Sequence, residues 1–417
     1  MMAQPERAIL ASVIRSREDG ADAHLEELAK LAESAGAVVA GKLVQRRAAP
    51  HSATFLGAGK IEELQQLCYE TSADLVIVDH ELTPAQQRNL ERKLDLKVID
   101  RPGIVLDIFA RRARTHEGRL QVELAQMTYL LPRLTGRGVL LSRLGGGIGT
   151  RGPGETKLEV DRRRIRKRIT DLRRAISEIG RTRSLQRQAR KEAHLPVVAL
   201  VGYTNAGKST LLNALTSAGV FVEDKLFATL DPTVRKVNLP NGRPVLLVDT
   251  VGFITNLPVQ LVAAFRATLE EVTEADLLVH VVDASHPEWA AQVEAVREVL
   301  DELNAGDKPV VHAMNKADAV SHPEARRIIE EVGEGVAISA LQRVGLINLL
   351  RRIAQKLPEP LVKVRLLIPY AKARALSQIF SQGRVLRQDY GADGIAVEAE
   401  LPRVQAQQLK ALVRKAN

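Results

Sequence analysis

The chain has 417 residues, and its 45% hydrophobic and 26% charged content is typical of soluble globular domains. Its single cysteine, Cys68, excludes an internal disulfide and suits a reducing compartment. The sequence has no apolar run long enough to span a bilayer and no signal-peptide core. We therefore expect a monomeric cytoplasmic protein without integral membrane insertion, and peripheral membrane association stays open.

The net charge of +10 at pH 7 is concentrated in one segment, because residues 162–191 contain thirteen Lys or Arg and two acidic residues. Such a stretch is either a solvated helix face or a contact for a polyanion, most often nucleic acid. An anionic partner would relieve the repulsion between these like charges, so RNA contact is favoured. Since only 3% of residues are aromatic, we expect phosphate contact rather than base stacking. The expected contacts are Arg162, Arg163, Arg164, Arg166, Lys167 and Arg168.

Residues 1–115 alternate short apolar runs with helical patterns. RAILASVI, AVVAGKLV, ADLVIVD and LKVID are typical of strands, and the segments near 22–34, 59–71 and 83–95 are typical of helices. This alternation indicates βαβ units on a mostly parallel sheet. The first domain is therefore predicted to be an N-terminal α/β domain.

Residues 116–194 have the period of paired helices. One apolar seam consists of Leu120, Leu124, Met127, Leu131 and Leu134, and a second of Ile165, Ile169, Leu172, Ile176 and Ile179. Pro132 should end or kink the first helix, and a capping box from Thr156 to Glu159 should start the second. The pattern predicts a basic antiparallel hairpin with the Gly-rich stretch 145–156 (GGGIGTRGPGET) at its tip.

That stretch contains GIGTRG, a match to the dinucleotide fingerprint, but it lacks the preceding strand and the later acidic residue that the fingerprint requires. A tip loop that approaches RNA backbone is the better interpretation, with glycines for close approach and Arg151 as a phosphate-binding fork.

Residues 195–358 again alternate strands (VVALVG, VLLVDT, LLVHVVD, PVVHAMNK) with helices, which predicts a doubly wound α/β domain. The pattern of 362–417 is β-α-β-β-α, which predicts a small α+β domain. The fold class is thus α/β, with the hairpin between two α/β domains and an α+β domain at the end.

The clearest motif follows the strand VVALV and has the complete P-loop form G-x-x-x-x-G-K-S. Its backbone N–H groups would cradle phosphates, Lys208 would reach the β- and γ-phosphates, and Ser209 would ligate Mg²⁺. The motif comprises Gly202, Tyr203, Thr204, Asn205, Ala206, Gly207, Lys208 and Ser209.

Two further motifs end later strands. Asp249 can hold Mg²⁺ directly or through water, and the Gly252 N–H can meet the γ-phosphate. Asp318 can accept both N–H groups of the Watson–Crick edge of guanine, which adenine cannot match. The residues predicted at these loops are Asp249, Thr250, Val251 and Gly252, then Asn315, Lys316, Ala317 and Asp318, and Ser339, Ala340 and Leu341 beside the base.

The segment FATLDPT lies between the P-loop and Asp249, where a switch loop needs a threonine that ligates Mg²⁺ when the γ-phosphate is present. Thr229 and Thr233 both qualify on spacing, and spacing alone does not separate them. The nucleotide contacts expected here are Phe227, Ala228, Thr229, Leu230 and Asp231.

Taken together, GYTNAGKS, FATLDPT, DTVGF, NKAD and SA resemble a GTPase of the Obg–HflX branch, and GGGIGTRGPGETKLEVDRRR with RTHEGRLQVELAQ resembles the HflX family specifically. The resemblance implies a GTP/GDP ligand with Mg²⁺ and favours Thr229 as the magnesium ligand. It also implies binding to the large ribosomal subunit and its RNA, and separation of the subunits of stalled or stressed ribosomes. The hairpin tip would then reach toward the peptidyl transferase centre.

Phe253 follows Gly252, where small GTPases have a glutamine that orients the attacking water. A phenyl ring makes no such hydrogen bond, so we expect slow intrinsic hydrolysis. Two other interpretations stay open: a nucleotide-regulated RNA-binding or remodelling protein that is not dedicated to ribosomes, and a scaffold with a vestigial site. His280 is expected to be a strand-core histidine and Cys68 a buried apolar residue; His51 and His116 have no metal-ligand spacing.

Overall fold

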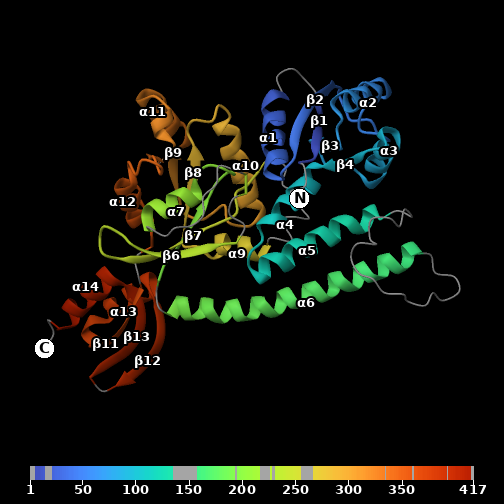
Figure 1. Cartoon of the computed structure of the whole chain (residues 1–417). Coiled ribbons are helices and arrows are strands. Elements are labelled where there is room, and N and C mark those ends of the chain that lie inside the picture. The colour runs from blue at the N-terminus through green and yellow to red at the C-terminus, as the bar shows by residue number, and fades with distance from the viewer. Residues whose placement is uncertain are drawn as a thin grey trace.

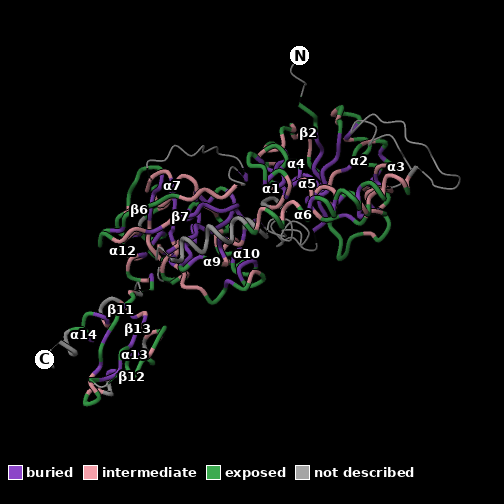
Figure 2. The backbone as a smooth tube through the Cα atoms, turned by 90° about the horizontal axis from the view of Figure 1, so that it is seen from below, coloured by how far each residue is buried: buried purple, intermediate pink, exposed green. Residues whose placement is uncertain are grey.

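The structure is a computed structural model that describes residues 5–14, 21–134, 157–192, 195–216, 226–227, 231–254, 266–333, 335–358, 361–391 and 393–414. Figure 1 shows the N-terminal and central α/β domains side by side, with a helical hairpin below them and the C-terminal domain at the lower left. Figure 2 shows buried residues gathered along the strands, and the C-terminal domain set apart from the other two.

The N-terminal domain is a parallel sheet with helices packed on it, in the order β2-β1-β3-β4. The inner strands β1 and β3 are buried apolar runs, as expected for a sheet covered on both faces, whereas the edge strand β2 is mostly half-buried or exposed. The predicted strands and helices are confirmed. One helix, α4, was not predicted, because the strand before it runs into RPGIVLDIFARR without a polar turn. The elements are β1 (Arg7–Ile14), α1 (Ala21–Ser34), β2 (Val38–Arg46), α2 (Ala58–Thr71), β3 (Leu75–Val78), α3 (Pro84–Leu94), β4 (Lys97–Asp100) and α4 (Arg101–Arg112).

The hairpin consists of α5 (His116–Leu130), a 3-10 turn η1 (Leu131–Arg133) that contains Pro132, and α6 (Lys157–Glu192). The two helices lie side by side and antiparallel, and α6 runs on below the central domain (Figure 1). The predicted seam of α6 is confirmed at Ile165, Ile169 and Leu172, which are buried. The tip 145–156, with Thr156 and Arg151, lies outside the described residues.

Helix α5 has two packed faces rather than one. The predicted seam residues Leu120, Leu124 and Met127 are half-buried, whereas Val122, Ala125 and Tyr129 are buried in the core that α4 shares. Helix α5 therefore lies between α4 and α6, so the hairpin is attached to the N-terminal domain along its length.

The central domain is a six-stranded sheet in the order β10-β9-β8-β5-β7-β6, with β6 antiparallel to β7 at one edge. The carboxyl ends of β5, β7, β8 and β9 meet at the same edge, which confirms the doubly wound prediction. The short polar edge strand β6 (TVRKVN) was not predicted. The strands are β5 (Val197–Val201), β6 (Thr233–Asn238), β7 (Pro244–Asp249), β8 (Leu277–Asp283), β9 (Val310–Asn315) and β10 (Gly335–Ala337). The helices are α7 (Lys208–Thr216), α9 (Arg266–Glu274), α10 (Trp289–Glu302), η2 (Ala317–Ala319), α11 (His322–Val332) and α12 (Leu346–Lys356).

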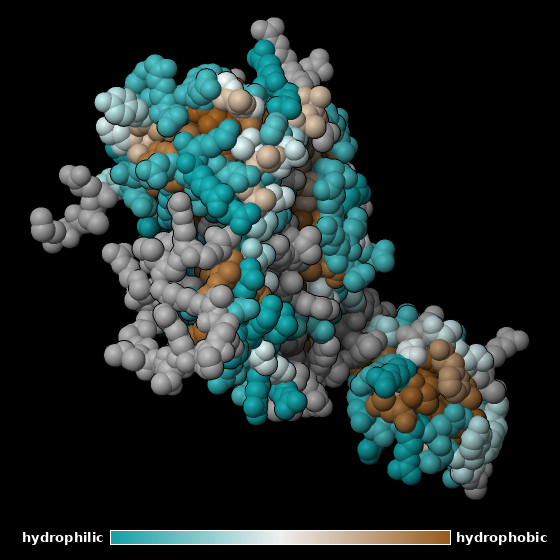
Figure 3. Space-filling model, turned by 90° about the vertical axis from the view of Figure 1, so that its right-hand side faces the viewer, coloured by the Kyte–Doolittle hydropathy of each residue, from teal (hydrophilic) through white to brown (hydrophobic). Residues whose placement is uncertain are grey.

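The C-terminal domain has the predicted β-α-β-β-α order and an antiparallel sheet β11-β13-β12. In Figure 3 apolar atoms gather at the centre of its visible face. Its exposed apolar side chains include Leu367, Phe380 and Leu386. Its elements are β11 (Leu361–Ile368), η3 (Tyr370–Lys372), α13 (Ala373–Gln382), β12 (Arg384–Gly391), β13 (Gly394–Pro402) and α14 (Arg403–Arg414).

The N-terminal and central domains share one apolar core. Phe109 of α4 and Phe227 of the central domain pack edge to face, with ring centroids 4.6 Å apart, and both belong to that core. Among the described helices, none is long and apolar enough to cross a membrane.

Candidate guanine nucleotide site

The P-loop motif from Gly202 to Ser209 leads from β5 into the first turn of α7 and requires glycine at two positions. Gly202 and Gly207 have φ values of 149° and 94°, which other residues rarely adopt. A Cβ at Gly202 would clash with the Val281 carbonyl, and one at Gly207 with the Asn315 amide. The loop therefore turns tightly against β8 and β9.

Lys208 is buried, and its Nζ donates to the carbonyls of Gly202 (2.9 Å) and Tyr203 (2.8 Å). Burial lowers the pKa of Lys208 to about 8, while the nearby Asp249 carboxylate acts in the opposite direction. A bound phosphate would add a negative charge beside this buried ammonium and would favour its protonated form. Nearby, the buried Thr204 hydroxyl has no hydrogen-bond partner among the described residues, so this loop retains an unused polar group.

Ser209 and Asp249 lie together, with the Ser209 hydroxyl donating to Asp249 Oδ2 at 2.6 Å. Asp249 ends β7 and is fully buried. A hydroxyl and a carboxylate beside a phosphate-binding loop are the hard oxygen donors that suit Mg²⁺. Thr233 lies opposite Asp249 as the first residue of β6, whereas Thr229, with Ala228 and Leu230, lies outside the described residues.

The Gly252–Phe253 segment runs beside the P-loop. The Thr204 N–H donates to the Phe253 carbonyl (2.8 Å), and the Phe253 N–H donates to the Gly202 carbonyl (3.1 Å). A Cβ at Gly252 would lie 2.8 Å from Thr204 Cα and 3.0 Å from Lys208 Nζ, so only glycine fits. The Phe253 side chain is 2% exposed and belongs to the apolar core, so its ring is packed among apolar side chains and offers no hydrogen bond to water. The Thr250 hydroxyl donates to the Leu200 carbonyl, and Val251 is buried.

Asn315 joins the two ends of the site, because its Nδ2 donates to the Ala206 carbonyl (2.8 Å) and its Oδ1 accepts from the Ala340 N–H (3.0 Å). Lys316 has a left-handed backbone and pairs with Asp283 at 2.7 Å. Asp318, in η2 with Ala317, is exposed; Ser339 is buried and Leu341 is 80% exposed. This edge thus presents a carboxylate and an apolar surface, which suit a guanine base.

The N-terminal domain reaches the P-loop through a buried ionic cluster that sequence reasoning missed. The Tyr203 hydroxyl donates to the Glu27 carboxylate, which also pairs with Arg101. Arg101 is only 2% exposed and pairs with Asp79 at 2.6 Å. These partners are far apart in sequence, so no local pattern connects them. A cleft of about 350 Å³ lies beside this contact, between α1 and the P-loop.

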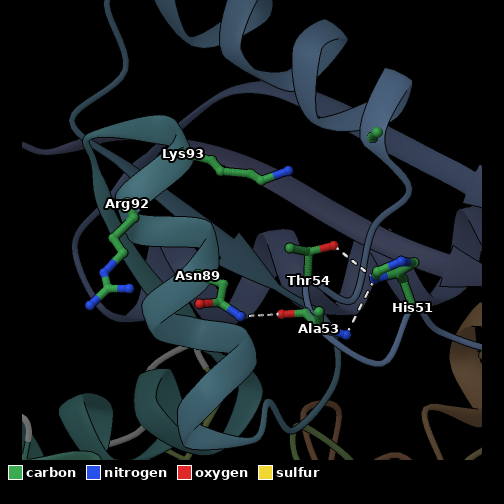
Figure 4. A pocket seen from close by; sticks show the side chains of 7 residues that line it. His51, Ala53, Thr54, Asn89, Arg92 and Lys93 are labelled. Carbon is green, nitrogen blue, oxygen red and sulfur yellow. Dashed lines mark hydrogen bonds between the residues drawn. The ribbon is translucent and has the colours of Figure 1, made fainter.

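A second hollow lies in the N-terminal domain, where His51, Thr54, Asn89, Arg92 and Lys93 line it (Figure 4). Its polar side chains hold the loop itself. His51 Nδ1 lies 3.0 Å from the Thr54 hydroxyl, and the Asn89 amide donates to the Ala53 carbonyl at 2.8 Å. Over the part of the chain that the structure describes, no group of three His, Cys, Asp or Glu could hold a metal ion.

The remaining expectations concern single residues. His280 is buried in β8, and burial lowers its pKa to about 3, which confirms a strand-core histidine. Cys68 is buried in α2, and burial raises the pKa of its thiol. Asp231, expected at the nucleotide, instead directs its carboxylate to the N-terminus of α5.

A P-loop between a parallel strand and its helix, an aspartate at the end of the neighbouring strand and an NKAD turn two strands away define a GTPase domain of the P-loop class. Comparisons with known proteins agree. Residues 22–110 match the family described as "GTP-binding GTPase N-terminal", 112–190 "GTP-binding GTPase Middle Region" and 197–316 "50S ribosome-binding GTPase".

The chain belongs to the HflX family of GTPases, and its activity is the hydrolysis of GTP. It is 51% identical to GTPase HflX of Caldanaerobacter subterraneus subsp. tengcongensis over 95% of this chain and 91% of that protein. It is 42% identical to GTPase HflX of Escherichia coli (strain K12), over 96% and 94%. A crystal structure of a GTP-binding protein from Sulfolobus solfataricus with GDP is 25% identical, covering 84% of this chain and 98% of that one, with a TM-score of 0.45.

Proposed function

We propose that this GTPase binds the large ribosomal subunit and separates the subunits of stalled or stressed ribosomes. The observation that carries the proposal is the basic, exposed face of α6, the helix that lies on the outer side of the hairpin (Figure 1). Arg164, Arg166 and Lys167 are exposed on it. Two other predicted contacts are engaged within the hairpin: Arg168 with Glu123, and Arg162 with the Leu134 carbonyl. The match of 197–316 to a ribosome-binding family supports the same partner.

In the nucleotide site, Lys208 would hold the β- and γ-phosphates and the Gly252 N–H would meet the γ-phosphate. Ser209, Asp249 and Thr229 would hold Mg²⁺, which neutralises charge on the phosphates during transfer. Asp318 would read guanine, while the Ser339–Leu341 loop would contact the base. Asp318→Asn should lower the preference for GTP over ATP. It should also lower the preference for GTP over XTP, because xanthine has a carbonyl oxygen where guanine has its amino group. An unchanged preference would contradict the assignment.

Hydrolysis by the free protein should be slow, because Phe253 is buried and supplies no hydrogen bond to the attacking water. The water would be oriented by another group or by the ribosome. GTP turnover measured with and without large subunits tests this proposal. Fast turnover by the free protein that ribosomes leave unchanged would refute it.

Ribosome binding can be tested by sedimentation in sucrose gradients with a non-hydrolysable GTP analogue. Arg164→Glu with Arg166→Glu should abolish co-migration with large subunits, because phosphate contacts are lost. Arg326→Glu with Arg327→Glu, an exposed pair on α11, is the matched control and should co-migrate like the wild type. No co-migration of the wild type would favour a GTPase whose target is other RNA.

The tip loop lies outside the described residues, so its role rests on sequence. Deletion of 146–153 should spare GTP binding and impair subunit splitting in the same gradients. Lost GTP binding by a folded protein would reverse the assignment of this loop to RNA.

A further inference from the structure

The motif RTHEG at residues 114–118 has no role in the nucleotide chemistry above. It contacts Asp231 of the predicted switch loop FATLDPT, residues 227–233, called the switch segment below. Asp231 Oδ2 accepts hydrogen bonds from the N–H groups of Arg114 (3.0 Å) and Thr115 (2.9 Å), and its Oδ1 accepts from the Thr115 hydroxyl. A carboxylate is favoured here, because the N-terminus of a helix carries a partial positive charge. Asp231 thus acts as a cap for α5 from 116 residues away.

The RTHEG residues are suited to this occupant. Thr115 is the N-cap of α5, and its Oγ1 accepts the Gly118 N–H at 3.0 Å while donating to Asp231. A Cβ at Gly118 would clash with the Asp231 carboxylate, so glycine leaves the space that Asp231 fills. The Thr115 cap alone does not require this space, so the glycine at position 118 is explained by the Asp231 carboxylate.

A second contact holds the other end of the same segment. Phe227 packs edge to face on Phe109 of α4, and its ring is buried. Its backbone has φ of 58°, a conformation that is uncommon for a bulky residue and concentrates at switch regions. Phe227 and Asp231 are four residues apart, and both contact the corner between α4 and α5. Two residues after Asp231, Thr233 begins β6 opposite Asp249.

We propose that the corner between α4 and α5 is the anchor of the switch segment, and that Asp231, Thr115 and Gly118 are positioning residues for the GTP-bound state. Through this anchor the γ-phosphate side of the nucleotide site is mechanically joined to α5, and hence to the basic hairpin. That the switch segment carries the magnesium ligand Thr229 rests on the proposed function; the anchor itself does not.

The test compares the affinities of the full-length protein for GDP and for a non-hydrolysable GTP analogue in Mg²⁺. Asp231→Ala and Thr115→Val should each weaken the GTP analogue relative to GDP by about tenfold, a typical coupling between two sites. Their double variant should be no worse than either alone. Thr115→Ser keeps the hydroxyl and should restore the wild-type ratio.

Thr83→Val is the matched control, because Thr83 is also a threonine N-cap in the N-terminal domain and its side chain pairs with Gln86 of its own helix. It should keep the wild-type ratio. A ratio unchanged by Asp231→Ala and Thr115→Val, or lowered equally by Thr83→Val, would overturn the proposal.

Hydrogen exchange separates the anchor from the role of Thr229. Asp231→Ala should accelerate exchange at the Arg114 and Thr115 amides, since these lose their acceptor; unchanged exchange there would overturn the anchor. If Thr229→Ala leaves the GTP-to-GDP ratio unchanged while Asp231→Ala alters both exchange and ratio, the role of Thr229 is rejected and the anchor is supported.

Discussion

His280 should make the central domain sensitive to acid. It is 4% exposed in β8, with its ring centroid 5.2 Å from that of His312. Its pKa falls from an ordinary 6.5 to about 3, first through burial and then through the neighbouring positive charges of His312 and Lys208. The folded pKa is depressed, so the unfolded chain binds more protons than the folded one between about pH 3 and 6.5, and stability is lost as the pH falls through that range.

The size of the effect follows from these pKa values. Between pH 7 and pH 5 the His280 contribution should lower the free energy of unfolding by about 2 kcal/mol, at roughly 1.4 kcal/mol per pKa unit. Urea unfolding followed by fluorescence measures it, because Trp289 is the single tryptophan and lies in the central domain.

In His280→Leu the free energy of unfolding should fall by about 2 kcal/mol less between pH 7 and pH 5 than in the wild type, whatever the stability of the variant at pH 7. His116→Gln is the control, a replacement of a histidine on the exposed surface of α5 rather than in the core. The same loss in His280→Leu as in the wild type would refute the reasoning.

Three further changes test packing and the site. Tyr203→Phe removes the bond to Glu27 and should lower the free energy of unfolding by about 2 kcal/mol in urea, as for a hydrogen bond to a charged group; an unchanged value would show that the bond contributes nothing. Leu172→Ala, at the buried seam of α6, should cost about 3 kcal/mol in the same assay, and a loss below 1 kcal/mol would mean that the seam is loosely packed. Gly252→Ala displaces Thr204 or Lys208 and should reduce kcat for GTP hydrolysis by about a hundredfold; wild-type turnover would contradict the close approach.

The elements that sequence predicted are those with a local signature. The strands of the N-terminal and central domains are apolar runs between turn residues, and the P-loop, DTVG and NKAD motifs each follow such a run. The α6 seam was predicted because its apolar residues keep one spacing. In each case the information lies within a few residues along the chain.

What sequence did not predict depends on distant partners. Helix α4 follows its strand directly, and β6 has the polar composition of a loop, so only sheet pairing reveals it. The second face of α5 is recognised only beside α4. The cluster of Arg101, Glu27 and Tyr203, and the contact of Asp231 with Thr115, join residues that are separated by 74 to 176 positions. Sequence supplied the residues predicted for the nucleotide site but not the contact that Tyr203 makes with the N-terminal domain.

Helix α6 is continuous for 36 residues, and its C-terminal end lies a few residues before β5, the strand that leads into the P-loop. At 1.5 Å per residue it is about 54 Å long, so a tilt of about 5° at that end would move the other by about 5 Å. The chain enters β5 just after that end of α6, and the P-loop follows at the opposite end of the strand. A small rotation of α6 is therefore amplified along the hairpin, because the displacement grows with distance from the C-terminal end of the helix.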